Sequence, residues 1–145
     1  MGVLIDNRQN WFKISPVKIR KKAQAVLDAL GCPEDELSIL LVNDPQISEL
    51  NQEYLKKSGP ANVISFPMRE GDFSDITPQL LGDVVISLDT AQREAATAQI
   101  PFESRVLQLL VHGILHLVGY THENSASEAL KMEQKAEELL EIICI

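Results

Sequence analysis

The sequence predicts an α+β fold, in which mixed α/β elements form a single four-stranded sheet covered by about five helices. Four apolar runs have the length of strands, and five longer segments carry apolar residues at helical spacing. The first half of the chain alternates between the two kinds of segment, whereas the last three helical segments follow one another. Because the chain has 145 residues and no repeat or linker-like stretch, residues 1–145 are expected to form one domain.

The four expected strands are short runs rich in Val, Ile and Leu. They cover residues 1–6, 37–42, 62–66 and 81–87. Pro67 closes the third strand, since proline cannot donate a hydrogen bond to a sheet. Residues 68–80 are polar and contain Gly71 and Pro78, so they are expected to form a loop.

The five expected helices are marked by capping residues as well as by their apolar spacing. Ser15 and Pro16 are a typical N-cap and first helical residue, and Gly31 is a typical C-terminal residue for the same helix. Ser125 and Glu128 form a capping-box pattern for the last helix. The others are expected from Asp44, from Asp89 or Thr90 to about Gln99, and from about Glu103 to Val118.

Composition excludes several classes of protein. The net charge of −8 argues against non-specific nucleic-acid binding, which depends on a basic surface. Local basic residues nevertheless occur at 18–22 and at Lys56 and Lys57. No apolar run approaches the 20 or so residues of a membrane span, so we expect no membrane partner. The two cysteines, Cys32 and Cys144, make no disulfide framework, which favours a cytoplasmic location with reduced thiols.

The three histidines of the chain fall within 11 consecutive residues, with the spacing H-x3-H-x5-H. His112 and His116 are four residues apart, so they project from one face of a helix. Gly119 can end that helix and let the chain bring His122 back toward the pair. Three imidazoles are typical of a catalytic zinc site that keeps its fourth position for water. Zinc is therefore the expected cofactor, and nickel is a second metal that imidazoles bind well.

The residue after the first histidine distinguishes this pattern from that of the common zinc peptidases. In the H-E-x-x-H motif of those enzymes, a glutamate at this position acts as the general base. Here it is Gly113, which carries no side chain that could act as a base. The helix thus resembles that of a metalloprotease in its histidine spacing, while peptide hydrolysis is disfavoured.

Three blocks of sequence resemble the YbeY family of bacterial metal-dependent endoribonucleases, which act in ribosomal RNA maturation. The blocks are LNQEYLKKSGPANVISFP at residues 50–67, LGDVVIS at residues 81–87 and HGILHLVGYTH at residues 112–122. The resemblance implies an endoribonuclease specific for single strands, with ribosomal RNA or the ribosome as partner and no DNA substrate. The family has an arginine where this chain has Leu55, and aspartates where it has Asn62 and Thr121.

The resemblance also suggests roles for individual residues. The expected metal ligands are His112, His116 and His122. We expect His116 to be a catalytic residue as well. Asp83 matches a family position and is expected to orient a ligand or to act as a general base. For substrate binding, we expect Lys56 and Lys57 to guide the RNA backbone, and Asn62 and Ser65 to line the cleft.

Two alternative functions remain open from the sequence. The chain could be a ribosome-associated assembly factor whose zinc stabilises the fold, since the polar groups expected at positions 55, 62 and 121 are changed. It could also be a metal-dependent hydrolase of another substrate, since an open metal position permits such chemistry. The sequence does not determine the oligomeric state.

Overall fold

The computed structural model describes residues 2–68, 80–120 and 125–143. Its four strands form one sheet in the order β1-β2-β4-β3. β1, β2 and β4 run parallel, whereas β3 is antiparallel to β4 and forms one edge. The predicted four-stranded mixed sheet is confirmed; its strands are β1 (Val3–Asn7), β2 (Glu36–Val42), β3 (Val63–Pro67) and β4 (Leu80–Ser87).

Five helices accompany the sheet, as the sequence predicts. They are α1 (Pro16–Ala29), α2 (Asp44–Leu55), α3 (Leu88–Ala98), α4 (Phe102–Leu117) and α5 (Ala126–Ile143). The predicted caps are present, because the Ser15 hydroxyl accepts from the Lys18 amide at 3.2 Å and the Ser125 hydroxyl from the Glu128 amide at 3.1 Å. Most of the expected loop at residues 68–80 lies outside the described residues, as do Met1, Thr121, His122 and Cys144.

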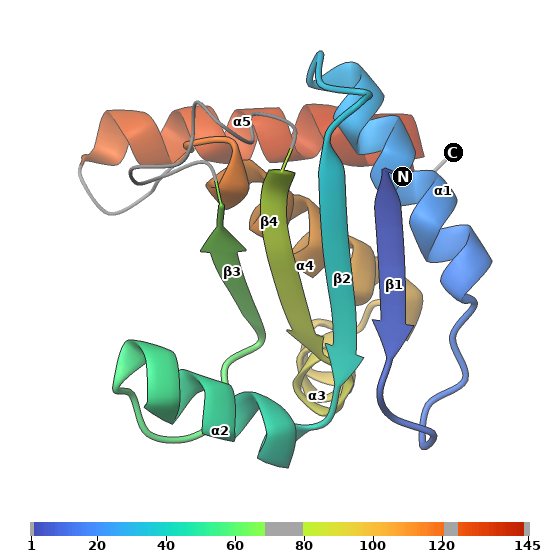
Figure 1. Ribbon diagram of the computed structural model, residues 1–145, viewed down its shortest axis with the longest axis vertical. Coiled ribbons are helices and arrows are strands. Elements are labelled where there is room, and N and C mark those ends of the chain that lie inside the picture. The colour runs from blue at the N-terminus through green and yellow to red at the C-terminus, as the bar shows by residue number, and fades with distance from the viewer. Residues whose placement is uncertain (1, 69–79, 121–124, 144–145) are drawn as a thin grey trace.

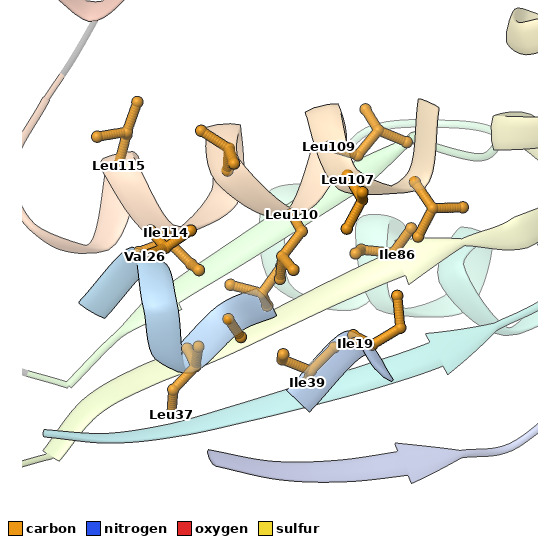
Figure 2. Packing of buried hydrophobic residues seen from close by; sticks show 14 of the residues in the cluster. Ile19, Val26, Leu37, Ile39, Ile86, Leu107, Leu109, Leu110, Ile114 and Leu115 are labelled. Atoms are coloured by element: carbon orange, nitrogen blue, oxygen red, sulfur yellow. The ribbon is translucent and has the colours of Figure 1, made fainter. Parts of the chain in front are cut away.

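The helices cover the two faces of the sheet unequally (Figure 1). The larger apolar core joins one face of the sheet to α1, α3, α4 and α5, and Figure 2 shows Ile19, Ile39 and Ile86 converging on Leu110 and Ile114 of α4. On the opposite face, Ile47 of α2 packs with Val42, Ile64 and Val85 in a smaller cluster. Among the described residues, no helix combines the length and apolar character needed to cross a bilayer.

Helix α4 lies unusually close to the sheet at Gly113. A β-carbon placed there would lie 2.7 Å from Cγ1 of Val84 and 3.2 Å from Cγ2 of Val63, closer than side-chain carbons pack. The Ser65 hydroxyl of β3 donates to the Gly113 carbonyl at 2.9 Å, which fastens the edge strand to the helix at the same point. Gly113 therefore sets the height of α4 above β3 and β4.

The first turns of α2 and α3 cap each other. The Asp44 carboxylate of α2 accepts from the hydroxyls of Ser87 and Thr90 at 2.6 and 2.7 Å, while the Asp89 carboxylate of α3 accepts from the Asp44 amide at 2.8 Å. Arg93 pairs with Asp44 at 2.8 Å. Burial raises the pKa of Asp44, but the two hydroxyls and the Arg93 charge outweigh it and leave the pKa below its usual value. The carboxylate thus ties α2 to the end of β4.

We predict that Gly113→Ala destabilises the protein by about 1–2 kcal/mol, because overpacking outweighs the gain in helix propensity. The measurement is the urea midpoint of unfolding. In a Val84→Ala background the methyl groups of Val84 are gone and only Val63 stays in close contact, so the same substitution should cost clearly less. A stabilising effect of Gly113→Ala in the wild-type background would contradict the close packing described for α4.

We predict that Asp44→Asn lowers the free energy of unfolding by about 1–2 kcal/mol at pH 7, since hydrogen bonds to a charged group are lost. A depressed pKa means that the carboxylate stabilises the fold above pH 3.8, its usual value, and that this contribution disappears as the pH falls below it. Urea unfolding of both proteins from pH 7 to 3 should therefore show the difference shrinking at acid pH. Asp6→Asn, which breaks an exposed pair with Arg8, is the control with little expected effect.

Candidate functional site

The two described histidines converge on one side of α4, next to the sheet-facing Gly113. The Nε2 atoms of His112 and His116 are 3.0 Å apart, and the rings meet edge to face with centroids 4.6 Å apart. Both rings are half-buried, whereas their helix neighbours Val111 and Leu115 are fully buried. The apolar side of α4 thus anchors the helix and leaves the two imidazoles at the surface.

This geometry suits a shared metal ion. Two imidazole nitrogens bonded to one zinc at about 2.0–2.1 Å lie roughly 3.3 Å apart at a tetrahedral angle. The observed 3.0 Å separation of the two Nε2 atoms is close to that value. A neutral imidazole offers a lone pair on one nitrogen only, and in this chain Nε2 is the nitrogen that faces the partner ring.

The expected third ligand, His122, lies outside the described residues, and so does Thr121. α4 ends at Leu117, within one residue of the predicted end at Val118, and the chain is described as far as Tyr120 before the gap at residues 121–124. Gly119 has a φ of +103°, and the amide of Tyr120 donates to the Leu115 carbonyl at 3.0 Å, which closes the helix in a turn. Within the described residues, no group of three His, Cys, Asp or Glu side chains is placed to hold a metal. The three-histidine centre stays a prediction.

A pocket of about 440 Å³ opens beside His112. It lies between α4, α5 and the residue that precedes β3. Its polar lining comes from Asn62, Arg105, Gln108 and His112 together with Glu133 and Glu137 of α5. Leu109, Met132 and Leu140 supply apolar lining. The candidate site therefore combines a histidine pair with an open pocket large enough for part of a substrate.

Asn62, one of the predicted substrate-binding residues, lines this pocket, and its role in binding stays a prediction. Its side-chain amide donates to both carboxylate oxygens of Glu94, at 3.3 and 3.2 Å. Glu94 also accepts from Nε of Arg105 at 3.1 Å, and Nη1 of Arg105 donates to Gln108 at 2.8 Å. A hydrogen-bonded chain thus runs from β3 through α3 to α4 and ends one turn before His112.

Sequence reasoning missed Glu94, Arg105 and Gln108. A signal for two of them was present, because positions 105, 108, 112 and 116 recur at the spacing of one helix face. Glu94 carried no such signal, since it lies on another helix and joins the network only through the fold.

Of the other predicted substrate-binding residues, Ser65 lies at the turn of α4 that carries the histidine pair, where its hydroxyl donates to the Gly113 carbonyl. The two lysines lie elsewhere. Lys56 and Lys57 are exposed at the end of α2, and Nζ of Lys56 donates to the Glu53 carbonyl at 3.0 Å. The basic residues at 18–22 begin α1, beside β1 at the opposite edge of the sheet, so they form no continuous channel with Lys56 and Lys57 (Figure 1).

Asp83 lies on the face of the sheet that points away from α4. It pairs directly with Phe66, which packs with the cluster beneath α2, and its neighbour Val84 packs against Gly113. Directly opposed residues of antiparallel strands share a face, and successive residues of a strand alternate. The structure therefore does not bring Asp83 to the histidine pair, and its catalytic role stays a prediction.

Comparison with known proteins extends these observations to the whole chain. The model of the family described as "Endoribonuclease YbeY" matches residues 4–143. The curated protein named Endoribonuclease YbeY from Geobacter sulfurreducens is 49% identical over 144 residues, covering 99% of this chain and 96% of the relative. The protein of the same name from Aquifex aeolicus is 45% identical over 122 residues, which cover 84% of this chain and 79% of the relative.

A solved structure supports the fold. The solution structure of a protein from Thermotoga maritima superposes on this chain with a TM-score of 0.68 and 22% sequence identity. The match covers 97% of this chain and 88% of the Thermotoga chain. A histidine-bearing helix on a mixed four-stranded sheet, matched nearly end to end by proteins named endoribonucleases, defines a class of α+β nucleases. The chain belongs to the YbeY family.

Proposed function

We propose that the chain is a metal-dependent endoribonuclease that cuts single-stranded ribosomal RNA during its maturation, in the cytoplasm and in contact with the ribosome. The observation that carries the proposal is the convergence of two imidazole Nε2 atoms, 3.0 Å apart, beside an open pocket. Membership of a family whose curated members are named endoribonucleases supports the choice of RNA as substrate.

In this proposal His112, His116 and His122 hold one zinc ion, or nickel in its place. Bound there, such an ion would lower the pKa of a coordinated water molecule to about 7 and so would supply hydroxide near neutral pH. The chain itself holds the two described imidazoles with their Nε2 atoms facing each other, on a helix whose apolar side is fixed in the core. The site is thereby built on a rigid element before any substrate arrives.

The pocket supplies the groups that would contact RNA beside the metal. Arg105 lines it and provides planar N–H donors, which suit the carbonyl oxygen of a base. Lys56 and Lys57 are exposed and are proposed to meet the RNA backbone farther from the cut bond. No step is assigned to Asp83, because it faces the other side of the sheet.

We predict that His116→Ala lowers RNA cleavage at least about 100-fold and reduces the zinc content of the purified protein. The assay compares a labelled single-stranded RNA with its duplex and with DNA of the same sequence. Only the single-stranded RNA should be cut by the wild type. Ser127→Ala, an exposed change at the start of α5, serves as the control for handling and folding.

Two results would overturn the proposal. Equal cleavage by wild type and His116→Ala would exclude the histidine pair as the reacting centre. A wild type that holds zinc and cuts no RNA, combined with a lower melting temperature for His116→Ala, would instead support a zinc-stabilised assembly factor. Turnover of a non-RNA substrate that depends on His116 would support the third function that the sequence leaves open.

We predict that Leu55→Arg raises the rate of RNA cleavage by roughly 10-fold, since it restores the guanidinium of the family pattern and charge-assisted hydrogen bonds are strong. Leu55 is 44% exposed, so the substitution should be tolerated by the fold. Leu55→Met, which keeps the size without the charge, is the matched control. No gain with arginine would mean that a guanidinium at this position does not limit the rate in this chain.

A further inference from the structure

We propose that the pocket beside His112 receives one nucleobase of the RNA strand and selects bases that carry an exocyclic amino group over uracil. This inference rests on the proposed function, because it identifies which part of an RNA substrate enters the pocket. The walls are α4, α5 and the residue before β3, so His112 belongs to the pocket as well as to the histidine pair.

The apolar lining of the pocket suits a flat ring. Leu109 of α4 and Met132 and Leu140 of α5 border a space of about 440 Å³. Leu109 and Met132 are almost fully buried, so the floor they form is fixed by the core. Single-stranded RNA is recognised through unstacked bases that are turned into such sites. A base with its sugar fits this volume, whereas a duplex does not enter a pocket of this size.

The charges of the pocket favour a base over a phosphate. Glu133 and Glu137, one turn apart on α5, both line it. Arg105, the one Lys or Arg among the described lining residues, is already paired with Glu94. A phosphate entering this pocket would meet two carboxylates and a guanidinium whose charge is largely compensated. A neutral base meets no such repulsion, and the phosphate can stay outside on the histidine side.

The hydrogen-bonding groups of the pocket determine which bases it prefers. A carboxylate only accepts hydrogen bonds, so Glu133 and Glu137 match an exocyclic amino group. Carboxylates accept in this way from the N4 amino group of cytosine. Uracil has a carbonyl oxygen at that position, which repels a carboxylate. Cytosine, adenine and guanine all carry an amino group, and uracil does not.

The amide side chains on the opposite wall are held in fixed orientations. The Asn62 amide group donates to Glu94, so its carbonyl oxygen is the atom left to accept from a base. The Gln108 carbonyl accepts from Arg105, so its amide group is left to donate. Because the Glu94–Arg105 pair fixes both amides, the wall is pre-organised and distinguishes donor from acceptor positions on a base edge.

The test compares cytosine with uracil, two bases of the same size that differ at this group. Single-stranded oligouridylates carrying one cytidine are incubated with the zinc-loaded wild-type protein, and cleavage positions are mapped by product length. We expect cleavage next to the cytidine to exceed cleavage at the matching uridine by about fivefold. The double variant Glu133→Gln/Glu137→Gln should reduce this ratio to below about twofold.

Glu138→Gln is the matched control. Glu138 lies on the same helix, pairs with Lys135 at 3.5 Å and does not line the pocket, so the cytidine preference should be unchanged. Cleavage without a cytidine preference in the wild type would overturn the inference, and so would a preference that survives in the double variant. An equal loss of preference in Glu138→Gln would also overturn it, because the effect would then be one of overall charge.

A binding measurement separates failure of the inference from failure of the proposed function. Cytidine and uridine monophosphate are titrated into the zinc-loaded protein while amide NMR shifts of Gln108 and Met132 are followed. Stronger binding of cytidine monophosphate, with shifts at both residues, supports the inference even where RNA is not cut. Equal binding of the two nucleotides overturns it, whereas cleavage of RNA in the same preparation would leave the proposed function intact.

Discussion

The close contact between α4 and the sheet at Gly113 is the constraint on which the candidate site depends. A helix can approach a sheet this closely only where it lacks a side chain, and here Val84 and Val63 fill the space that a β-carbon would take. The Ser65 hydroxyl then fixes the edge strand to the same turn of the helix. His112 and His116 flank this turn, so the position of their rings follows from the contact beneath them.

The same residue that makes this contact possible removes a catalytic option. In zinc peptidases the position after the first histidine supplies a glutamate base, and here it faces the sheet instead of the solvent. Packing and chemistry are thus linked at one position. Glycine at position 113 lets α4 pack close to the sheet, and it cannot act as the general base that zinc peptidases have there. A proton acceptor therefore has to come from a position other than 113.

The sequence predicts the elements of this fold well because their signals are local. Caps such as Ser15 and Ser125 and the apolar runs of the strands depend on neighbouring residues, and the structure confirms them. The histidine pair was predictable for the same reason, as a spacing on one helix. The side on which Asp83 lies was not, because it depends on the register with Phe66. Glu94 escaped prediction because it meets Arg105 and Asn62 only when three elements are packed together.

The net negative charge of the chain is compatible with the proposed action on RNA if the phosphate and the base of a nucleotide are bound at different sites. Non-specific affinity for RNA comes from phosphate charge, and a protein of net charge −8 gains little of it. Selective contacts would then carry a larger share of binding: in the proposed function, a metal at the histidines for the reacting phosphate, and the amide- and carboxylate-lined pocket for a base. An enzyme built in this way leaves most RNA alone and acts where an accessible strand offers a fitting base. The carboxylates of α5, which weaken general attraction to RNA, are on this argument the groups that provide its selectivity.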